Sequence, residues 1–341
     1  MRVFHSPDSP RHDPERYWRR GTPIPHPEQA ERYAILREAA LRGGHALAEP
    51  GDHGLDPIRA VHDPAYVAFL AEAWTRRGEM PGIGDEILSG VFARPHMHRR
   101  PAGLLGLAGL YMADTSTPIR AGTWDAIHGA AQCAIAAADA ALAEGHAYAL
   151  CRPPGHHAYA DSAGGFCFLN NSAIAAARML AATGGPVAIL DIDVHHGNGT
   201  QGIFYARPDV LTVSVHADPS DYFPFFAGYA DETGTGAGIG CNRNLPLPTG
   251  SGDAPWLEAV EAGLATIAAH RPRGLVVALG LDASADDPIG ALRVSRAGFA
   301  GAAERIARVG LPTALVQEGG YLCAALPENL TAFLAAFDAA R

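Results

Sequence analysis

Ala188-Ile-Leu-Asp-Ile-Asp-Val-His-His-Gly-Asn-Gly-Thr200 is the stretch that most directly predicts the fold of this chain. A short apolar run that ends in turn residues is typical of a buried strand. In open α/β sheets, ligands bind beyond the carboxyl ends of the strands. Side chains two positions apart in an extended chain point the same way, so Asp191, Asp193 and His195 share one side. The stretch therefore predicts a buried strand with a metal site at its carboxyl end.

Strands and helices are predicted to alternate from Trp124 onward. Short apolar runs alternate with helical spacing of apolar residues, which is the pattern of a parallel sheet with helices on both faces. The sequence has no internal repeat, so the alternation predicts one doubly wound α/β domain over residues 1–341. The predicted strands are 146–151, 187–190, 210–215, 275–281 and 313–316, and the predicted helices are 126–144, 171–182, 254–270, 295–309 and 327–339.

The sequence before Trp124 is rich in Pro, Gly and His and predicts little regular structure. In residues 1–60 we expect loops and one helix, near 27–42. Residues 80–123 predict a loop that is longer than the ordinary connections between secondary-structure elements. Loops of such length in a compact domain are usually lids or binding loops.

The composition excludes several classes of protein. The net charge is −10 and no long basic run occurs, which argues against a nucleic-acid-binding surface. The sequence has no signal-peptide core and no uncharged apolar stretch of about twenty residues, so we expect no membrane span. Scattered cysteines without CxxC spacing argue against disulfides and for a reducing, cytoplasmic location. The cysteines are Cys133, Cys151, Cys167, Cys241 and Cys323.

Polar residues follow one predicted strand after another, which places them at one edge of the sheet. Asp193, His195 and Asp282 can supply two oxygen ligands and one nitrogen ligand to a metal ion. Three such ligands leave a position open for water or substrate, as in a catalytic zinc site, and Fe²⁺ also fits them. The alternative for Asp282 is that it caps a helix or a turn.

Two further elements indicate acid–base chemistry. His156 and His157 follow a Pro-Pro-Gly turn and suit proton transfer, and Asp191 and Asn198 are available to fix their tautomers. The alternative is a pair of loop histidines with no catalytic role. In Glu318-Gly-Gly-Tyr321, the glycines allow a sharp turn, and the phenol can stabilise an oxyanion. The alternative is an ordinary turn.

The order of these motifs resembles the zinc-dependent histone deacetylase family. The matching motifs are Arg152-Pro-Pro-Gly-His-His157, Gly164-Gly-Phe-Cys-Phe-Leu-Asn-Asn171, Asp191 to Thr200, and Glu318-Gly-Gly-Tyr321. The stretch from Phe223 to Gly234 and the asparagine at 198 are more similar to the bacterial acetylpolyamine amidohydrolase branch than to other members.

The resemblance implies the arginase–deacetylase fold, a single domain around a parallel sheet of eight strands. It assigns zinc to Asp193, His195 and Asp282, in agreement with the ligand pattern. It implies that His157 is the general base and acid, that His156 is its electrostatic neighbour, and that Tyr321 polarises the substrate carbonyl. It further implies that Asp191 pairs with His156, that Phe166 and Phe223 line the tunnel, and that the Gly165 carbonyl binds the substrate amide. One potassium site is implied at Asp191, Ser214 and Val215, with backbone atoms of Asp193 and His195. A second potassium site is implied at Phe204, Arg207 and Val210.

The resemblance also implies the reaction, which is hydrolysis of an N-acetyl amide on a small amine. Acetylpolyamines are the expected substrates, and the segment 80–123 is expected to close the channel in a homodimer. Residues 88–113 contain no Asp or Glu, although acids in this loop receive a cationic substrate in that branch. Nearby acids that could replace them are Glu15, Asp85, Glu86 and Asp114.

Three alternative functions differ in what they require of the sequence. A protein acetyl-lysine deacetylase would use the same catalytic residues. A binuclear ureohydrolase would carry further Asp and His ligands in place of Tyr321 and the tandem histidines. A non-catalytic acyl-lysine-binding module would more plausibly lack a metal ligand, His157 or Tyr321, and all of these are present.

Overall fold

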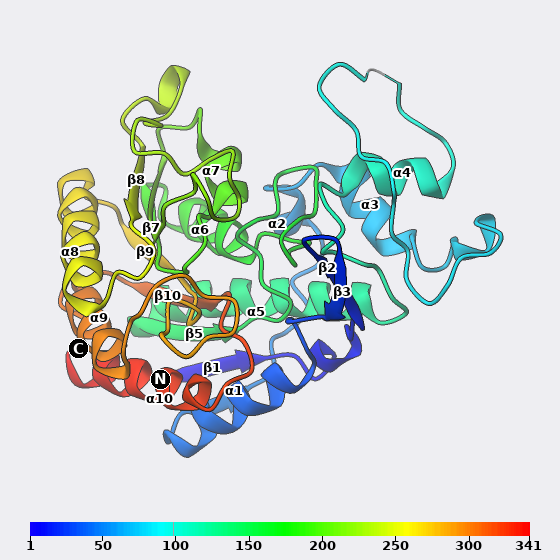
Figure 1. Ribbon diagram of the computed structural model, residues 1–341. Coiled ribbons are helices and arrows are strands. Elements are labelled where there is room, and N and C mark those ends of the chain that lie inside the picture. Colours follow the sequence, from blue (N-terminus) through cyan, green and yellow to red (C-terminus); the bar gives the residue numbers. More distant parts are fainter. Residues whose placement is uncertain (98) are drawn as a thin grey trace.

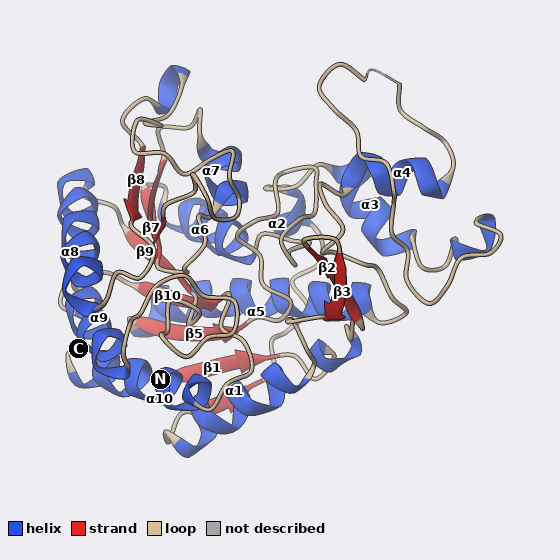
Figure 2. Cartoon of the chain, viewed as in Figure 1, coloured by secondary structure: helices blue, strands red, loops and turns tan. Residues whose placement is uncertain are grey.

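A sheet of eight strands runs through the centre of the computed structural model, which describes residues 1–97 and 99–341 (Figures 1 and 2). Every neighbouring pair of strands is parallel, as the alternation of strands and helices predicts. The predicted α/β fold is therefore confirmed. In spatial order the strands are β4 (Ala46–Ala48), β1 (Arg2–His5), β5 (His146–Leu150), β10 (Thr313–Gln317), β9 (Gly274–Leu279), β6 (Val187–Asp191), β7 (Val210–Ala217) and β8 (Asn242–Leu247).

Helices cover both faces of the sheet, and a hydrophobic core lies on each face (Figure 1). Successive residues of β6 alternate between the cores, with Ile189 in one and Ala188 and Leu190 in the other. Burial on both faces explains why the strands are continuous apolar runs. The first face is covered by α5 (Thr123–Glu144) and α6 (Asn171–Thr183), and the second by α1 (Glu31–Arg42), α8 (Asp253–His270), α9 (Arg296–Ala307) and α10 (Ala325–Ala339).

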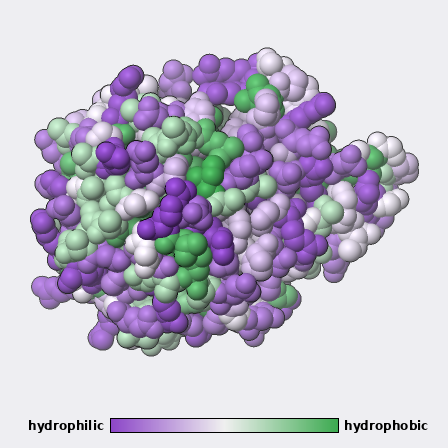
Figure 3. Space-filling view, turned by 90° about the horizontal axis from the view of Figure 1, so that it is seen from below, coloured by the Kyte–Doolittle hydropathy of each residue, from purple (hydrophilic) through white to green (hydrophobic). Residues whose placement is uncertain are grey.

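The alanine-rich helix α5 packs against β1, β5 and β10. By length and composition it could cross a membrane, but 78% of its most apolar window is buried inside the molecule. Its apolar residues are therefore used in the core. On the face seen from below in Figure 3, hydrophilic residues predominate and hydrophobic residues form small separate groups.

Before Trp124 the chain contains more regular structure than the sequence predicts. The segment 1–60, predicted as loops with one helix, also holds the edge strand β4, its neighbour β1, and a hairpin of β2 (Arg16–Arg19) and β3 (Thr22–Pro25). These strands have three or four residues each, too few to show a hydrophobic period. The helices α2 (Asp56–Arg59) and α3 (Pro64–Glu72) were also not predicted and, after Trp124, neither was the strand β8.

The helix α4 (Leu104–Tyr111) lies within the segment 80–123, so the prediction of a continuous loop was wrong there. Two glycines lower the helix propensity of this stretch. Burial of Leu104, Leu107 and Tyr111 stabilises the helix despite those glycines. Tertiary packing therefore decides the structure of these residues.

Candidate active site

The predicted site residues converge at the carboxyl ends of β5, β6, β9 and β10. A pocket of about 620 Å³ opens there, with His157, His195 and Tyr321 in its lining. The polar clusters meet because all four strands are parallel and end at the same edge of the sheet.

Asp193, His195 and Asp282 form a compact group of ligand atoms, all within 4.8 Å of one another. Nδ1 of His195 lies 3.0 Å from Oδ1 of Asp193 and 3.3 Å from Oδ2 of Asp282. Ligands that bind zinc at about 2 Å are separated from one another by about 3 Å, so these spacings fit the ion. Oδ2 of Asp282 is buried and has no hydrogen-bond partner among the described residues. The three side chains are therefore well suited to hold a divalent metal.

Backbone N–H groups orient the two carboxylates of this group. Asp193 accepts hydrogen bonds from the N–H of His195 (2.8 Å) and of Gly319 (2.8 Å). Asp282 accepts one from Val194 (3.0 Å), so it bonds another segment rather than capping its own turn. A Cβ atom at residue 319 would lie 2.0 Å from Oδ2 of Asp282, which explains why glycine is required there.

The tandem histidines have different electrostatic surroundings. Nδ1 of His156 lies 2.9 Å from Oδ2 of Asp191, as predicted for this pair. Burial disfavours the charged form, but the carboxylates of Asp191 and Asp193 raise the pKa of His156 well above its ordinary value. His156 is therefore protonated at neutral pH.

His157 is instead kept neutral. Its Nδ1 lies 2.6 Å from Oδ1 of Asn198, the first residue of α7 (Asn198–Phe204). Burial, followed by the charge of His156, lowers the pKa of His157 well below its ordinary value. An amide oxygen only accepts, so Nδ1 carries the hydrogen and Nε2 is free to take a proton.

Tyr321 lies in the pocket wall and is 3% exposed. Its N–H donates to Oδ2 of Asp287 (2.8 Å), and its ring lies 5.8 Å from that of Phe166. Burial, above all, raises the pKa of Tyr321 well above 10. The phenol therefore stays protonated and can donate a hydrogen bond.

Aromatic rings line the passage to the metal group. Phe223 meets His157 edge-on with ring centroids 4.8 Å apart, and Tyr222 stacks on His195 at 4.9 Å. Gly165 and Phe166 lie in the same wall. Gly165 has φ +54°, and a Cβ there would lie 2.5 Å from the ring of His157, so the close approach requires glycine. The structure thus brings the predicted tunnel residues together.

Part of the pocket mouth consists of residues that the sequence did not single out. The β2–β3 hairpin supplies Trp18, Arg19 and Arg20, and Phe226 of the opposite loop is 93% exposed. Within the part of the chain that the structure describes, neither arginine forms an ion pair. The hairpin carries no motif, so only its place in the fold reveals it.

Of the four nearby acids, Asp114 lines the pocket. Its carboxylate accepts hydrogen bonds from the N–H groups of Gly165 (3.0 Å) and Ser116 (2.8 Å). Glu15 and Glu86 lie beside Arg120 instead, at 3.1 and 3.9 Å. Asp85 does not line the pocket.

Glu318 has a supporting role that its motif did not indicate. Its carboxylate accepts hydrogen bonds from the N–H groups of Gly155 (2.6 Å) and His156 (3.0 Å) and from the hydroxyl of Ser172 (2.6 Å). Burial, above all, raises its pKa to about 7. Glu318 thereby joins the loop of the tandem histidines to the segment that carries Tyr321.

The residues implied for potassium lie on neighbouring elements. Asp191 is paired in register with Ser214 across β6 and β7, and Val215 follows directly. Phe204, Arg207 and Val210 lie between the end of α7 and the start of β7, where the Phe204 carbonyl accepts from the N–H of Arg207 (2.9 Å). Both potassium sites stay predictions.

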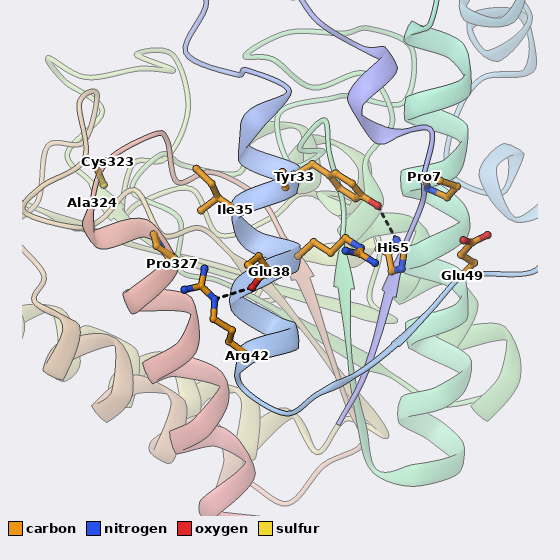
Figure 4. A pocket seen from close by; sticks show the side chains of 12 residues that line it. His5, Pro7, Tyr33, Ile35, Glu38, Arg42, Glu49, Cys323, Ala324 and Pro327 are labelled. Carbon is orange, nitrogen blue, oxygen red and sulfur yellow. Dashed lines mark hydrogen bonds and ion pairs between the residues drawn. The ribbon is translucent and has the colours of Figure 1, made fainter.

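A second cavity, of about 920 Å³, lies between β1, α1 and the start of α10 (Figure 4). In it Tyr33 and His5 are joined by a 2.8 Å hydrogen bond. None of the predicted catalytic or metal residues lines this cavity. We therefore assign the substrate to the smaller pocket, which reaches His157 and the metal group.

Comparisons with known proteins agree with this assignment. The family model of the histone deacetylase domain matches residues 26–337. An acetylpolyamine amidohydrolase of Burkholderia pseudomallei is 45% identical, and the alignment covers 100% of both chains. Acetylpolyamine amidohydrolase 1 of Pseudomonas aeruginosa is 46% identical over 90% of this chain and 89% of its own. The crystal structure of the acetylpolyamine aminohydrolase from B. pseudomallei has a TM-score of 0.96 at 44% identity, and covers 100% of this chain and 99% of that one. This match confirms the predicted arginase–deacetylase fold.

Proposed function

The chain belongs to the histone deacetylase family, and we propose that it is a metal-dependent hydrolase that removes the acetyl group from acetylpolyamines. One observation carries the proposal. Asp193, His195 and Asp282 meet a neutral His157 and a protonated Tyr321 at the floor of one aromatic pocket. Full-length similarity to acetylpolyamine amidohydrolases supports the substrate class.

The catalytic residues have separate tasks. A zinc ion held by Asp193, His195 and Asp282 supplies, when bound, the Lewis acid that amide hydrolysis needs; Fe²⁺ fits the same donors. His157 takes the proton of the attacking water on Nε2 and then returns a proton to the nitrogen of the leaving amine. The Tyr321 hydroxyl donates a hydrogen bond to the carbonyl oxygen as negative charge develops on it. Acetate and a free amine are the products.

His156 tunes this proton transfer. Its ring lies 3.9 Å from that of His157, and its positive charge is one of the causes that lower the pKa of His157. Asp191 holds the charge on His156, and Asn198 holds the hydrogen on Nδ1 of His157. These contacts keep Nε2 of His157 unprotonated and ready to act as a base.

Acetate release from a panel of amides tests the proposal. We expect the zinc-loaded protein to cleave acetylputrescine, acetylcadaverine and acetylspermidine faster than an acetyl-lysine peptide. Chelated protein and a His157→Ala variant are expected to release almost no acetate. Faster cleavage of the peptide would favour the protein deacetylase alternative, and no acetate from any substrate would contradict the hydrolase assignment.

We also propose that potassium occupies the two predicted sites and that the chain forms a homodimer through the segment 80–123. The register of Asp191 with Ser214 supports the first potassium site. Exposed apolar residues in the segment support pairing, since Val91 is 73% and Leu105 53% exposed. Figure 1 shows the part around α4 projecting from the body. Sedimentation of the wild type and of a Val91→Ser/Leu105→Ser variant would test the dimer, and a monomeric wild type would contradict it.

A further inference from the structure

Three charged side chains outside the described site are sealed from solvent in one cluster. Glu28, Arg32 and Arg152 are 0, 0 and 1% exposed. Oε1 of Glu28 lies 2.6 Å from Nη1 of Arg32 and 2.9 Å from Nε of Arg152, so one oxygen joins both guanidinium groups. Removing charges from water is costly, and a buried ion pair is often no more stable than an apolar replacement. The cluster therefore calls for an explanation other than stability.

Arg32 forms hydrogen bonds to the segment that carries the catalytic tyrosine. Its Nε donates to the carbonyl of Gly320 (2.6 Å) and its Nη2 to the carbonyl of Glu318 (2.8 Å). The guanidinium also lies over the ring of Tyr321, 4.8 Å from the centroid. The backbone on both sides of Gly319 and the aromatic ring are thus held by one planar group. A rotation of that guanidinium would break its bonds to both carbonyls and its contact with the Tyr321 ring.

Arg152 fixes the other side of Glu28. It stands four residues before His156, at the base of the loop that carries the tandem histidines. Its guanidinium donates to the carbonyls of Ser9 (2.6 Å), Gln29 (3.0 Å) and Glu28 itself (3.3 Å). Arg152 is therefore immobilised by several bonds besides its ion pair, and can anchor the carboxylate of Glu28.

We propose that Glu28 is a positioning residue for the reaction. Anchored by Arg152, its carboxylate orients Arg32, and Arg32 in turn sets the position of the Tyr321 side chain in the pocket wall. The inference rests on the proposed hydrolase function for its kinetic consequence. Its structural consequence, restraint of the backbone from Glu318 to Tyr321, is independent of any substrate.

A matched pair of variants gives the kinetic test. Glu28→Gln keeps the shape and removes the charge, and Glu31→Gln makes the same change at an exposed position of α1. With the best substrate of the panel, we expect Glu28→Gln to lower kcat about 10- to 100-fold, as small misplacements of catalytic groups do. KM is expected to change less than about threefold, since the hydroxyl acts mainly in the transition state. Equal kcat values for Glu28→Gln and Glu31→Gln would overturn the proposal.

A double-mutant cycle distinguishes positioning of Tyr321 from a general loss of structure. In a Tyr321→Phe background no hydroxyl remains to be placed, so adding Glu28→Gln is expected to cost at most about threefold. A merely structural role would instead give the same loss in both backgrounds, and that result would contradict the proposal.

Hydrogen exchange tests the inference even if no panel substrate is cleaved. In the metal-loaded protein, the amides of Gly319 to Tyr321 are expected to exchange faster in Glu28→Gln than in wild type or Glu31→Gln. Should Glu28→Gln not fold, Glu28→Gln/Arg152→Gln keeps the net charge of the cluster and replaces it in both experiments. Unchanged exchange in this segment would overturn the proposal, whereas failed acetate release with faster exchange would overturn only the proposed function.

Discussion

Charged residues are arranged differently at the two edges of the central sheet that are formed by the carboxyl ends and the amino ends of its strands. At the carboxyl edge, Asp193, Asp282 and Glu318 are each 0% exposed, and the carboxylates of Asp193 and Asp282 lie in one group of ligand atoms. At the amino edge, Asp338 is 31% exposed and meets the amino group of Met1 and the ring of His146, at 3.2 and 3.0 Å. The first arrangement brings like charges together out of water, and the second pairs opposite charges at the surface.

This difference indicates that residues at the carboxyl edge serve the reaction, whereas those at the amino edge stabilise the fold. Buried carboxylates repel each other, so Asp193 is among the causes that raise the pKa of Asp282, after burial. A group of this kind is retained for what it binds, because it does not stabilise the fold by itself. Substitutions at the carboxyl edge should therefore change activity, and those at the amino edge should change stability.

The largest effect is expected for His157→Ala. Loss of general acid–base catalysis should lower kcat by up to about 10⁴-fold. Because the metal ligands stay in place, the zinc content should equal that of the wild type. Assays of acetate release and bound metal check both parts, and a variant with near-normal turnover would contradict the role of His157.

The next effect is expected for Tyr321→Phe. Loss of one donor to the developing oxyanion should lower kcat about 10²- to 10³-fold. KM and the melting temperature should change little, since the ring and its contact with Arg32 are kept. Steady-state kinetics and thermal unfolding measure this, and a rise in KM alone would show that the hydroxyl acts in substrate binding.

A smaller effect is expected at the pocket mouth. Replacing Arg19 and Arg20 with Gln removes two positive charges from the path of a cationic substrate. Each repulsion is worth about 0.5 kcal/mol at roughly 8 Å in water, so KM for acetylspermidine should fall a few-fold. Acetylputrescine should change less, and kcat should not change. Equal KM values in low and high salt would contradict an electrostatic cause.

The smallest effect is expected for Asp338→Asn, at the amino edge. Burial raises the pKa of Asp338, but hydrogen bonds from His45 and the Met1 amino group outweigh it and lower the pKa to about 2. A carboxylate with a lowered pKa stabilises the fold fully at any pH above its ordinary pKa, which is near 4. This stabilisation is lost as the pH falls towards 2.

The variant should therefore lose about 1 kcal/mol of stability at pH 7, given the solvent screening of a partly exposed group. The difference from wild type should shrink below pH 4, while kcat at neutral pH stays the same. Urea unfolding across this range measures it, and a difference that grows on acidification would contradict the assigned ion pairs.

How much of the site the sequence predicts depends on where the partners lie in the chain. Asp191, Asp193 and His195 were found because one strand end carries all three within five residues. Asp282, His157 and Tyr321 were identified because each follows its own predicted strand, and the last two also lie in recognisable motifs. The pairing of His156 with Asp191 was also predicted, whereas the structure shows that Asn198 is the partner of His157.

Other parts of the site give no such signal. Arg32 bonds a carbonyl 286 residues away, and nothing near Glu28 in the sequence indicates that it lies between two arginines. The hairpin that carries Trp18, Arg19 and Arg20 is built from strands of four residues, too short for a periodic pattern. Their roles depend on contacts between distant segments.

By itself, the sequence determined the α/β alternation and the places of the candidate metal ligands and the tandem histidines at strand ends, because periodicity and strand-end polarity are properties of neighbouring residues. Only the tertiary structure decided the strands β1 and β4, the helix α4, the mouth of the pocket and the buried cluster around Glu28. These features arise from burial and hydrogen bonds between segments far apart in the chain, and no local pattern of residues encodes such contacts.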